Sequence, residues 1–376
     1  MVRLSWDAVL AWRTARQGLT IRAPATELLD VVARLCGVHA QVASSAELTL
    51  WARLDGLEPG TVDRLLWRDR ALVKTWAMRG TLHLLRASEL PRYTAALSRL
   101  KPRHHQPAWL RAHGLEREQA EAMLAAIRDV LAAGPPLTRE ALAGAVAART
   151  GHDDLAGKLA GGFGDLLKPA AFVGDLCHAK PDGRLVRFTA PRAWLGAWDA
   201  SDPATASAEV ARAYLSAYGP APREQFQRWF GMTSPAEAGR RLRELGDELE
   251  EVDVDGERGW MLAADAGEAA AAEPGGVVRL LPGFDQHVVP APRAAEAVLP
   301  ARFRARVYRS QGWLSPGLLV DGRMAGVWSH QKQGDELLVE IDAFVAPAAV
   351  VREQAEAEAA RLAAFLGGTP AVRWGW

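Results

Sequence analysis

The chain has 376 residues, and its 45 Lys and Arg balance 45 Asp and Glu, so the formal net charge is zero. This length predicts about two or three domains, and a content of 49% hydrophobic and 24% charged residues is typical of globular proteins. The sequence lacks an apolar run of about 18 residues and a signal-peptide pattern, which excludes an ordinary transmembrane helix and favours a soluble cytoplasmic protein. The two cysteines, Cys36 and Cys177, cannot build a disulfide framework or a four-cysteine zinc site.

The first hundred residues are helical in pattern and end in strands. Ser5 is a suitable N-cap for a helix that begins at Trp6, and Gly80 separates two strand-like runs. Helices followed by a strand pair are the layout of a winged helix-turn-helix. The expected elements are helices from Trp6 and over 26–36, 47–53 and 62–69, the apolar run 72–76, and a strand over 81–85.

The same layout recurs twice, in residues 117–199 and 207–262. In the second of these, Ser234, Pro235 and Glu237 form a capping box with proline at the first helical position. The expected elements are helices over 120–132, 139–150, 155–168, 209–218 and 223–230, a strand over 186–189 after the turn 181–184, and a hairpin that ends near 262.

The last hundred residues change character. The acidic run 264–276 is rich in Ala, Glu and Gly, which predicts a linker. Asp321-Gly322 is a strong hairpin signal, so we expect a small β-barrel or a curled antiparallel sheet. The expected elements are strands over 277–281, 306–308, 318–320 and 337–341, and a helix over 348–366 that Gly367 ends.

Charge is unevenly distributed along the neutral chain. Residues 64–103 hold ten cations and two acids, a net charge of +8, whereas residues 237–273 carry −8. Such segregation either steers a polyanion to one side of the protein or belongs to solvated helix faces. Arg302, Arg304 and Arg306 would share one face of a strand, where they either meet carboxylates or phosphates or guard an exposed edge. The ten cations are Arg64, Arg68, Arg70, Lys74, Arg79, Arg86, Arg92, Arg99, Lys101 and Arg103.

Several catalytic classes lack their motifs in this sequence. It has no P-loop, no dinucleotide-binding glycine pattern and no nucleophile elbow. His104 and His105 are adjacent and have no carboxylate at helical spacing, which argues against a metal site. One constellation remains, His39 and Gln41 in Gly37-Val38-His39-Ala40-Gln41. In an extended segment their side chains point the same way and can hold one water, although a partly buried histidine and a glutamine bonded to backbone would give the same pattern.

Three segments resemble the motifs of the AlkZ-like family of tandem winged-helix DNA glycosylases. They are WAMRGTLHLL (76–85), LLPGFDQHVV (280–289) and GWLSPGLLVDGRMAGVW (312–328). The resemblance implies an α+β fold of three tandem winged helix-turn-helix units and a β-barrel in a C-shape around duplex DNA. The implied domains are 1–110 with the catalytic motif, 111–200, 201–265, a barrel over 275–347, and a helix and tail over 348–376.

The resemblance also implies an activity. Family members are monofunctional glycosylases that hydrolyse the N-glycosidic bond of N7-alkylated purines, and some give resistance to genotoxic natural products by removing bulky guanine adducts. The catalytic motif of the family, Gln-x-Gln or Gln-x-Asp, falls on His39 and Gln41, with histidine in place of the first glutamine. No metal or other cofactor is required. A monomer acting at the nucleoid is implied, and the residues expected to contact DNA are Arg79, Thr81, His83, Arg86, Arg184 and Arg323.

Two other functions stay open on sequence grounds. A DNA-binding regulator would use the winged helices without chemistry, and a scaffold with a decayed active site is compatible with the histidine at position 39. Regulators usually dimerise and read half-sites. Three internally different units without an evident dimer helix favour a monomer that wraps its target.

Overall fold

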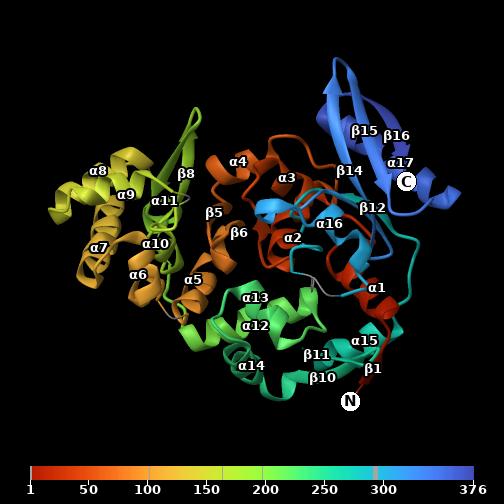
Figure 1. Ribbon diagram of the computed structural model, residues 1–376, viewed down its shortest axis with the longest axis horizontal. Helices are drawn as coiled ribbons and strands as arrows, with labels where there is room; N and C mark the ends of the chain where they lie inside the picture. The colour runs from red at the N-terminus through yellow and green to blue at the C-terminus, as the bar shows by residue number, and fades with distance from the viewer. Residues whose placement is uncertain (1, 101, 163, 197, 291–294) are drawn as a thin grey trace. The chain divides into compact units, whose positions relative to one another are not determined.

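A computed structural model describes residues 2–100, 102–162, 164–196, 198–290 and 295–376, and Figure 1 traces the chain through its helices and strands. The fold is mixed α+β, as the sequence predicts. The chain divides into two compact units, the first made of Met1–Thr61, Arg212–Trp229 and Ser234–Trp376, and the second of Val62–Ala211 and Phe230–Thr233. Lys101, one cation of the basic segment, lies outside the described residues.

The first unit combines elements from both ends of the chain. Its helices include α1 (Trp6–Arg16), α2 (Leu28–Arg34), α3 (Ala43–Trp51), the end of α12 (Pro203–Tyr218), α13 (Arg223–Phe230), α14 (Pro235–Arg243), α15 (Ala266–Ala271), α16 (Arg304–Val307) and α17 (Ala349–Leu366). Its strands include β1 (Val2–Leu4), β2 (Ala23–Pro24), β3 (Val38–His39), β4 (Leu54–Asp55), β10 (Leu249–Val254), β11 (Glu257–Leu262), β12 (Val278–Leu281), β13 (Gly317–Val320), β14 (Arg323–Gln333), β15 (Glu336–Ala343) and β16 (Thr369–Gly375).

Helix α1 begins where its sequence predicts. The Ser5 hydroxyl accepts a hydrogen bond from the Ala8 amide at 3.1 Å, which satisfies one of the free N–H groups of the first turn. On the buried face, Val9 and Trp12 pack in one core cluster with residues of β10, β11 and α15. The short strand β1 pairs in parallel with β10, a pairing that its three residues gave no means of predicting.

Helix α15 corrects the linker predicted over 264–276. Its Ala266 and Ala269 are buried in the same cluster as Trp12 of α1. Alanine has the highest helix propensity, and a small side chain lets two helices approach closely. The alanine-rich sequence therefore forms a packed helix rather than a flexible connection.

The C-terminal sheet has the strand order β12-β13-β14-β15-β16. Its two edge strands, β12 and β16, are not paired with each other, so no closed barrel is found in the part of the chain that the structure describes. Helix α17 packs against both edge strands, and Figure 1 shows it beside β16. The predicted barrel is thus an open five-stranded sheet covered by a helix.

The predicted arginine-bearing strand is wrong, because Arg304–Val307 form the short helix α16. Two of its arginines meet carboxylates: Arg304 pairs with Glu296 at 2.6 Å, and Arg306 pairs with Asp342 of β15. These pairs neutralise the repulsion between neighbouring cations, and the segment is neither a guarded edge strand nor a strand face for phosphates.

The second unit holds the helices and hairpins expected between residues 62 and 199. The predicted third helix, 155–168, is divided, because the chain turns with positive φ at Gly162 and Gly164. Strand β9 pairs with β8 on one side and with β7 on the other. The elements of the unit include α4 (Thr61–Trp67), β5 (Leu72–Trp76), β6 (Leu82–Arg86), α5 (Leu90–Ser98), α6 (Pro107–His113), α7 (Arg117–Ala133), β7 (Leu137–Thr138), α8 (Arg139–Thr150), α9 (Asp154–Ala160), α10 (Lys168–Phe172), β8 (Cys177–Asp182), β9 (Leu185–Thr189) and α11 (Pro191–Leu195).

The Asp321-Gly322 turn between β13 and β14 confirms the hairpin signal and carries a close contact. Both residues have positive φ, 45° and 78°, as a two-residue turn of this kind requires. A Cβ atom on Gly322 would lie 2.8 Å from Leu10 Cβ and 3.1 Å from the Leu10 carbonyl oxygen. The hairpin therefore touches the backbone of α1, and only glycine fits at this position.

We predict that Gly322→Ala destabilises the protein by at least about 2 kcal/mol more than Gly334→Ala, since both introduce a left-handed alanine but only the first adds steric overlap. Gly334 also has positive φ, 63°, and a Cβ atom added there would have no neighbour within 4 Å. Urea denaturation of the two variants measures the difference. Equal losses of unfolding free energy would contradict the steric role of Gly322.

Candidate active site

The segment with His39 and Gln41 begins at a sharp turn after α2. Cys36 and Gly37 have φ of 54° and 88°, so the chain leaves the helix through two left-handed residues and enters β3. The Gly37 amide bonds to the Val32 carbonyl at 2.9 Å, which closes the helix end. The turn directs the chain out of α2 and places His39 at the end of β3 and Gln41 in the bend before α3.

Two distant side chains bind the carbonyls of this turn. The Tyr218 hydroxyl donates to the Leu35 carbonyl at 2.7 Å, and Gln286 Nε2 donates to the Gly37 carbonyl at 2.6 Å. Burial raises the pKa of Tyr218 well above its usual value, so the phenol is a neutral donor. Because both donors are buried, water cannot easily replace them, and the turn is held from α12 and from the segment after β12.

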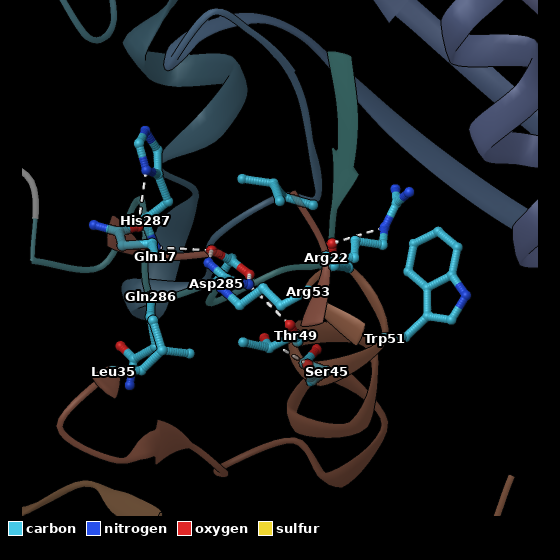
Figure 2. Close-up of polar contacts among 12 residues, drawn as sticks. Gln17, Arg22, Leu35, Ser45, Thr49, Trp51, Arg53, Asp285, Gln286 and His287 are labelled. Atoms are coloured by element: carbon cyan, nitrogen blue, oxygen red, sulfur yellow. Dashed lines mark hydrogen bonds and ion pairs between the residues drawn. The ribbon is translucent and has the colours of Figure 1, made fainter. Parts of the chain in front are cut away.

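A buried ion pair anchors Gln286. Arg53 donates to Asp285 through two nitrogens, at 2.7 and 2.8 Å, and both side chains have 0% exposure (Figure 2). Arg53 also donates to the Thr49 carbonyl of α3, and Asp285 accepts from the His287 amide at 2.7 Å. These bonds satisfy much of the polarity that burial would otherwise leave uncompensated. The pair fixes the 284–287 segment against α3.

His287 extends the polar network. Its ring nitrogens lie 3.0 Å from the Gln17 side chain and 3.0 Å from the Gly322 carbonyl. Burial lowers the pKa of His287 to about 4, an effect that outweighs the stabilising Gly322 carbonyl and Asp285 charge. The ring is therefore neutral near pH 7 and connects α1, the 284–287 segment and the β13–β14 turn.

The His39 side chain is held by an aromatic contact. It is 5% exposed and stacks on Phe284, with ring centroids 5.1 Å apart and planes at 18°. Phe284 has a positive φ of 62°, which its neighbours Gly283 and Asp285 hold in place by close packing and by the ion pair. Gln41, in contrast, is exposed. The two candidate residues thus combine a fixed, covered imidazole with an accessible carboxamide.

The residues expected to contact DNA differ in exposure. Arg184 is exposed in the turn between β8 and β9, and Arg79, Thr81 and Arg86 are partly buried in the segments around β6. His83 offers no surface to DNA in this structure, because the side chain has 0% exposure and Nδ1 lies 2.9 Å from the Thr81 carbonyl. Leu82–Leu85 of β6 are all buried, so this strand has no solvent face for a histidine.

Arg323 has a structural task in the first unit. It donates to the Ala297 carbonyl at 2.5 Å and pairs with Asp7 of α1 at 2.7 Å. These bonds hold the start of β14 near the helix N-terminus, where a carboxylate is favourable. The guanidinium is partly exposed, and each of its two terminal nitrogens already donates to a group of the protein.

The basic segment is only partly available for a polyanion. Its two acids each pair with an arginine, Asp69 with Arg64 and Glu89 with Arg92. Arg70 lies over the Trp194 ring, 4.0 Å from its centroid, and donates to the Trp194 carbonyl. Burial lowers the pKa of Lys74. The segment keeps its excess of positive charge, although several of its cations also stabilise the second unit.

Neither a metal cluster nor a membrane span is found in the described ranges. No three side chains of His, Cys, Asp or Glu are grouped to hold an ion there. The rings of His104 and His105 meet edge to face, with centroids 4.3 Å apart. No helix of the described chain is long and apolar enough to cross a bilayer.

Sequence reasoning missed the residues that hold the site. Phe284, Asp285 and Gln286 lie in one of the quoted motifs, yet nothing in the pattern assigned them a role. The available signal was charged Asp285 directly after apolar Phe284, since a carboxylate must find a partner when it is buried among apolar side chains. Its partner, Arg53, is 232 positions away in the chain.

The family follows from comparison with known proteins. A family model described as "DNA glycosylase AlkZ-like" matches residues 32–365. The chain belongs to the AlkZ-like DNA glycosylase family, which confirms the resemblance drawn from the three motifs.

Two relatives extend this assignment. An interstrand DNA cross-link repair glycosylase of Streptomyces sahachiroi is 40% identical over 342 residues, which cover 90% of this chain and 91% of that protein. The solved structure of Streptomyces sahachiroi DNA glycosylase AlkZ matches with a TM-score of 0.89 at 38% identity, and it covers 99% of this chain and 100% of the solved one.

We predict that Asp285→Leu destabilises the protein by about 3–5 kcal/mol, because it leaves the Arg53 charge buried without a partner. The double variant Arg53→Met with Asp285→Leu should recover at least half of this loss, since neither charge then remains. Urea denaturation measures both. Truncation of Glu251, which pairs with exposed Arg258, is the control and should cost less than about 1 kcal/mol. A double variant as unstable as Asp285→Leu would contradict this account.

The lowered pKa of His287 predicts a pH-dependent stability. The folded pKa of about 4 lies below the unfolded value near 6.5, so the contribution of the neutral ring is complete above about pH 6.5 and is lost as the pH falls toward 4. Between pH 7 and pH 5 the wild type should lose about 2 kcal/mol more unfolding free energy than His287→Asn. Denaturation at both pH values measures this, with His152→Asn as the control. Parallel curves for wild type and His287→Asn would refute the assignment.

Proposed function

We propose that this protein is a monofunctional DNA glycosylase that hydrolyses the N-glycosidic bond of an N7-alkylated purine in duplex DNA. Membership of the AlkZ-like family supports glycosylase activity. The relative named as an interstrand DNA cross-link repair glycosylase supports a role in DNA repair with cross-links as one substrate. We propose bulky guanine adducts and a role in self-resistance in addition. Excision would leave an abasic site and the free alkylated base.

The observation that carries the proposal is the immobilised turn with His39 and Gln41. The buried donors Tyr218 and Gln286 hold its carbonyls, and Phe284 covers the imidazole. A water nucleophile has to be placed against one carbon atom, and a misplacement of about 1 Å can cost about a hundredfold in rate. Rigid support of a short polar segment is what such positioning requires.

The chemistry needs few polar groups. Alkylation at guanine N7 makes the base cationic, so it is already a good leaving group and needs no protonation by the enzyme. The remaining tasks are to stabilise the oxocarbenium-like sugar and to orient water toward C1′. We propose that the Gln41 carboxamide oxygen orients the water and faces the developing positive charge, while His39 accepts a hydrogen bond from the same water.

Duplex DNA is the proposed partner. The basic segment 64–103 offers a sequence-independent attraction to phosphates. We propose Arg79, Thr81, Arg86 and exposed Arg184 as contacts. We omit buried His83, and also Arg323, whose terminal nitrogens donate to Ala297 and Asp7. This proposal includes three winged-helix units, over residues 1–110, 111–200 and 201–265. It also includes a C-shaped monomer that wraps DNA at the nucleoid.

We predict that Gln41→Ala abolishes base excision and changes duplex affinity by no more than a few-fold. His39→Gln should retain at least about a tenth of the wild-type rate, a barrier change of roughly 1.4 kcal/mol or less, because glutamine can also hold the water. His39→Ala should lose more. A gel assay for abasic sites on duplexes with N7-methylguanine, a bulky N7-guanine adduct or an interstrand cross-link measures excision.

Gln354→Ala, an equivalent truncation on α17, is the matched control. Wild-type rates in Gln41→Ala would remove this residue from the mechanism, and a His39→Gln variant as inactive as His39→Ala would make His39 a true base. A wild type that binds duplexes but excises none of the three lesions would favour the regulator. If His39→Gln alone gained activity, the scaffold with a decayed site would be the better description.

A further inference from the structure

Trp313 is a large apolar side chain that remains 52% exposed. Its neighbours on the same loop, Arg309–Gly312, are exposed as well. Single exposed apolar residues are common on protein surfaces, so exposure alone assigns no role. Two further features distinguish Trp313 from other exposed apolar residues: its loop is closed by hydrogen bonds, and its indole contacts Phe284.

The loop that carries Trp313 is closed by backbone hydrogen bonds. The Arg309 amide donates to the Trp313 carbonyl at 2.8 Å, and the Ser315 amide donates to the Val307 carbonyl at 2.9 Å. Gln311 and Gly312 turn the chain with φ of 56° and 76°. The indole is therefore attached to a fixed loop rather than to a flexible end.

A glycine on the facing segment lets this loop approach the site. A Cβ atom on Gly283 would lie 2.6 Å from the Leu314 carbonyl oxygen, a distance that real side chains do not reach. The absence of a side chain at Gly283 allows the two backbones to touch. Phe284 and Trp313, one residue along each segment, are thereby brought together.

The rings of Trp313, Phe284 and His39 form a continuous row from the surface to the interior. Trp313 meets Phe284 edge to face, with centroids 5.2 Å apart and planes at 81°. Phe284 in turn stacks on His39 at 5.1 Å. The exposed end of this row is the Trp313 indole, and its covered end is the candidate catalytic imidazole of His39. A flat ring bound on Trp313 would lie one phenyl ring away from His39.

We infer that Trp313 is a stacking residue that binds a planar, electron-poor aromatic ring of the damaged nucleotide beside the catalytic segment. This inference rests on the proposed function and names how that function selects its substrate. An indole face is negatively polarised and attracts cationic or electron-poor rings. The ring has two sources, the cationic alkylated purine itself or an aromatic system attached to it by the adduct, and both present the same chemistry.

The experiment measures binding without turnover, in a Gln41→Ala background. Fluorescence anisotropy gives the Kd for three duplexes: undamaged, carrying N7-methylguanine, and carrying a polycyclic aromatic N7-guanine adduct. Selectivity is the ratio of the undamaged Kd to the damaged Kd. We expect Trp313→Ala to lower the selectivity at least about fivefold, as alanine substitution of a base-stacking aromatic side chain does in other proteins. Trp313→Phe should keep most of the selectivity. The duplex with the larger loss identifies the source of the ring.

Two controls separate stacking from other effects. Trp313→Leu keeps apolar bulk without a π face and should lose selectivity as alanine does. Trp376→Ala removes another exposed tryptophan, 62% exposed, and should leave selectivity unchanged. Thermal melting of each variant reports folding, and the leucine variant serves if the alanine variant unfolds.

The outcomes distinguish this inference from the proposed function. If Trp313→Ala weakens binding equally on all three duplexes, Trp313 is a general DNA contact and the inference is overturned. The inference is also overturned if the leucine variant keeps wild-type selectivity, or if the Gln41→Ala parent shows no preference for damaged DNA. If the protein with intact Gln41 excises adducts while Trp313 variants keep wild-type selectivity, only the stacking role fails. If it excises nothing, the proposed hydrolysis fails, whereas a selectivity that depends on Trp313 would still support the stacking role.

Discussion

The bidentate ion pair between Arg53 and Asp285 is the interaction on which the candidate site depends. A guanidinium and a carboxylate without any solvent exposure lose their hydration, and only close pairing with further hydrogen bonds compensates that loss. The cost of separating them fixes the 284–287 segment at one position relative to α3. Phe284 and Gln286, on either side of the aspartate, then reach His39 and the Gly37 carbonyl. One electrostatic constraint thus determines the surroundings of the candidate catalytic segment from a distant part of the chain.

Long-range bonds from side chains to carbonyls recur throughout the first unit. Arg13 donates to the carbonyls of Gly219 and Pro220, and Arg361 donates to those of Trp51 and Leu54. Burial lowers the pKa of Arg13 to about 10, a value at which the side chain is still charged near neutral pH. Carbonyls at turns and helix ends have no regular partner, so a fork of N–H groups is an effective way to satisfy them. Part of the arginine content of the chain is explained by these structural tasks.

The division of labour in the site agrees with the demands of the proposed reaction. Departure of a cationic base needs no general acid. The rigid parts of the site therefore have two tasks, to position the water nucleophile and to position the aromatic ring of the damaged nucleotide. The imidazole of His39 is covered, whereas the Gln41 carboxamide and the Trp313 indole are exposed. Their relation depends on backbone contacts, above all the approach of Gly283 to Leu314, and not on a metal-binding pattern in the sequence.

By itself, the sequence determined most local structure and the family. Capping by Ser5 and Ser234, the Asp321-Gly322 turn and the helical spacing of apolar residues act within a few positions of the chain, so their physics is readable without the fold. The family could be recognised because its three motifs keep their order. The tertiary structure alone decided which motif residues serve the site, since the contact between Arg53 and Asp285 joins positions 232 apart. It also turned the predicted linker into α15, buried His83 and left the C-terminal sheet open, because burial and strand pairing depend on neighbours that are distant in the sequence.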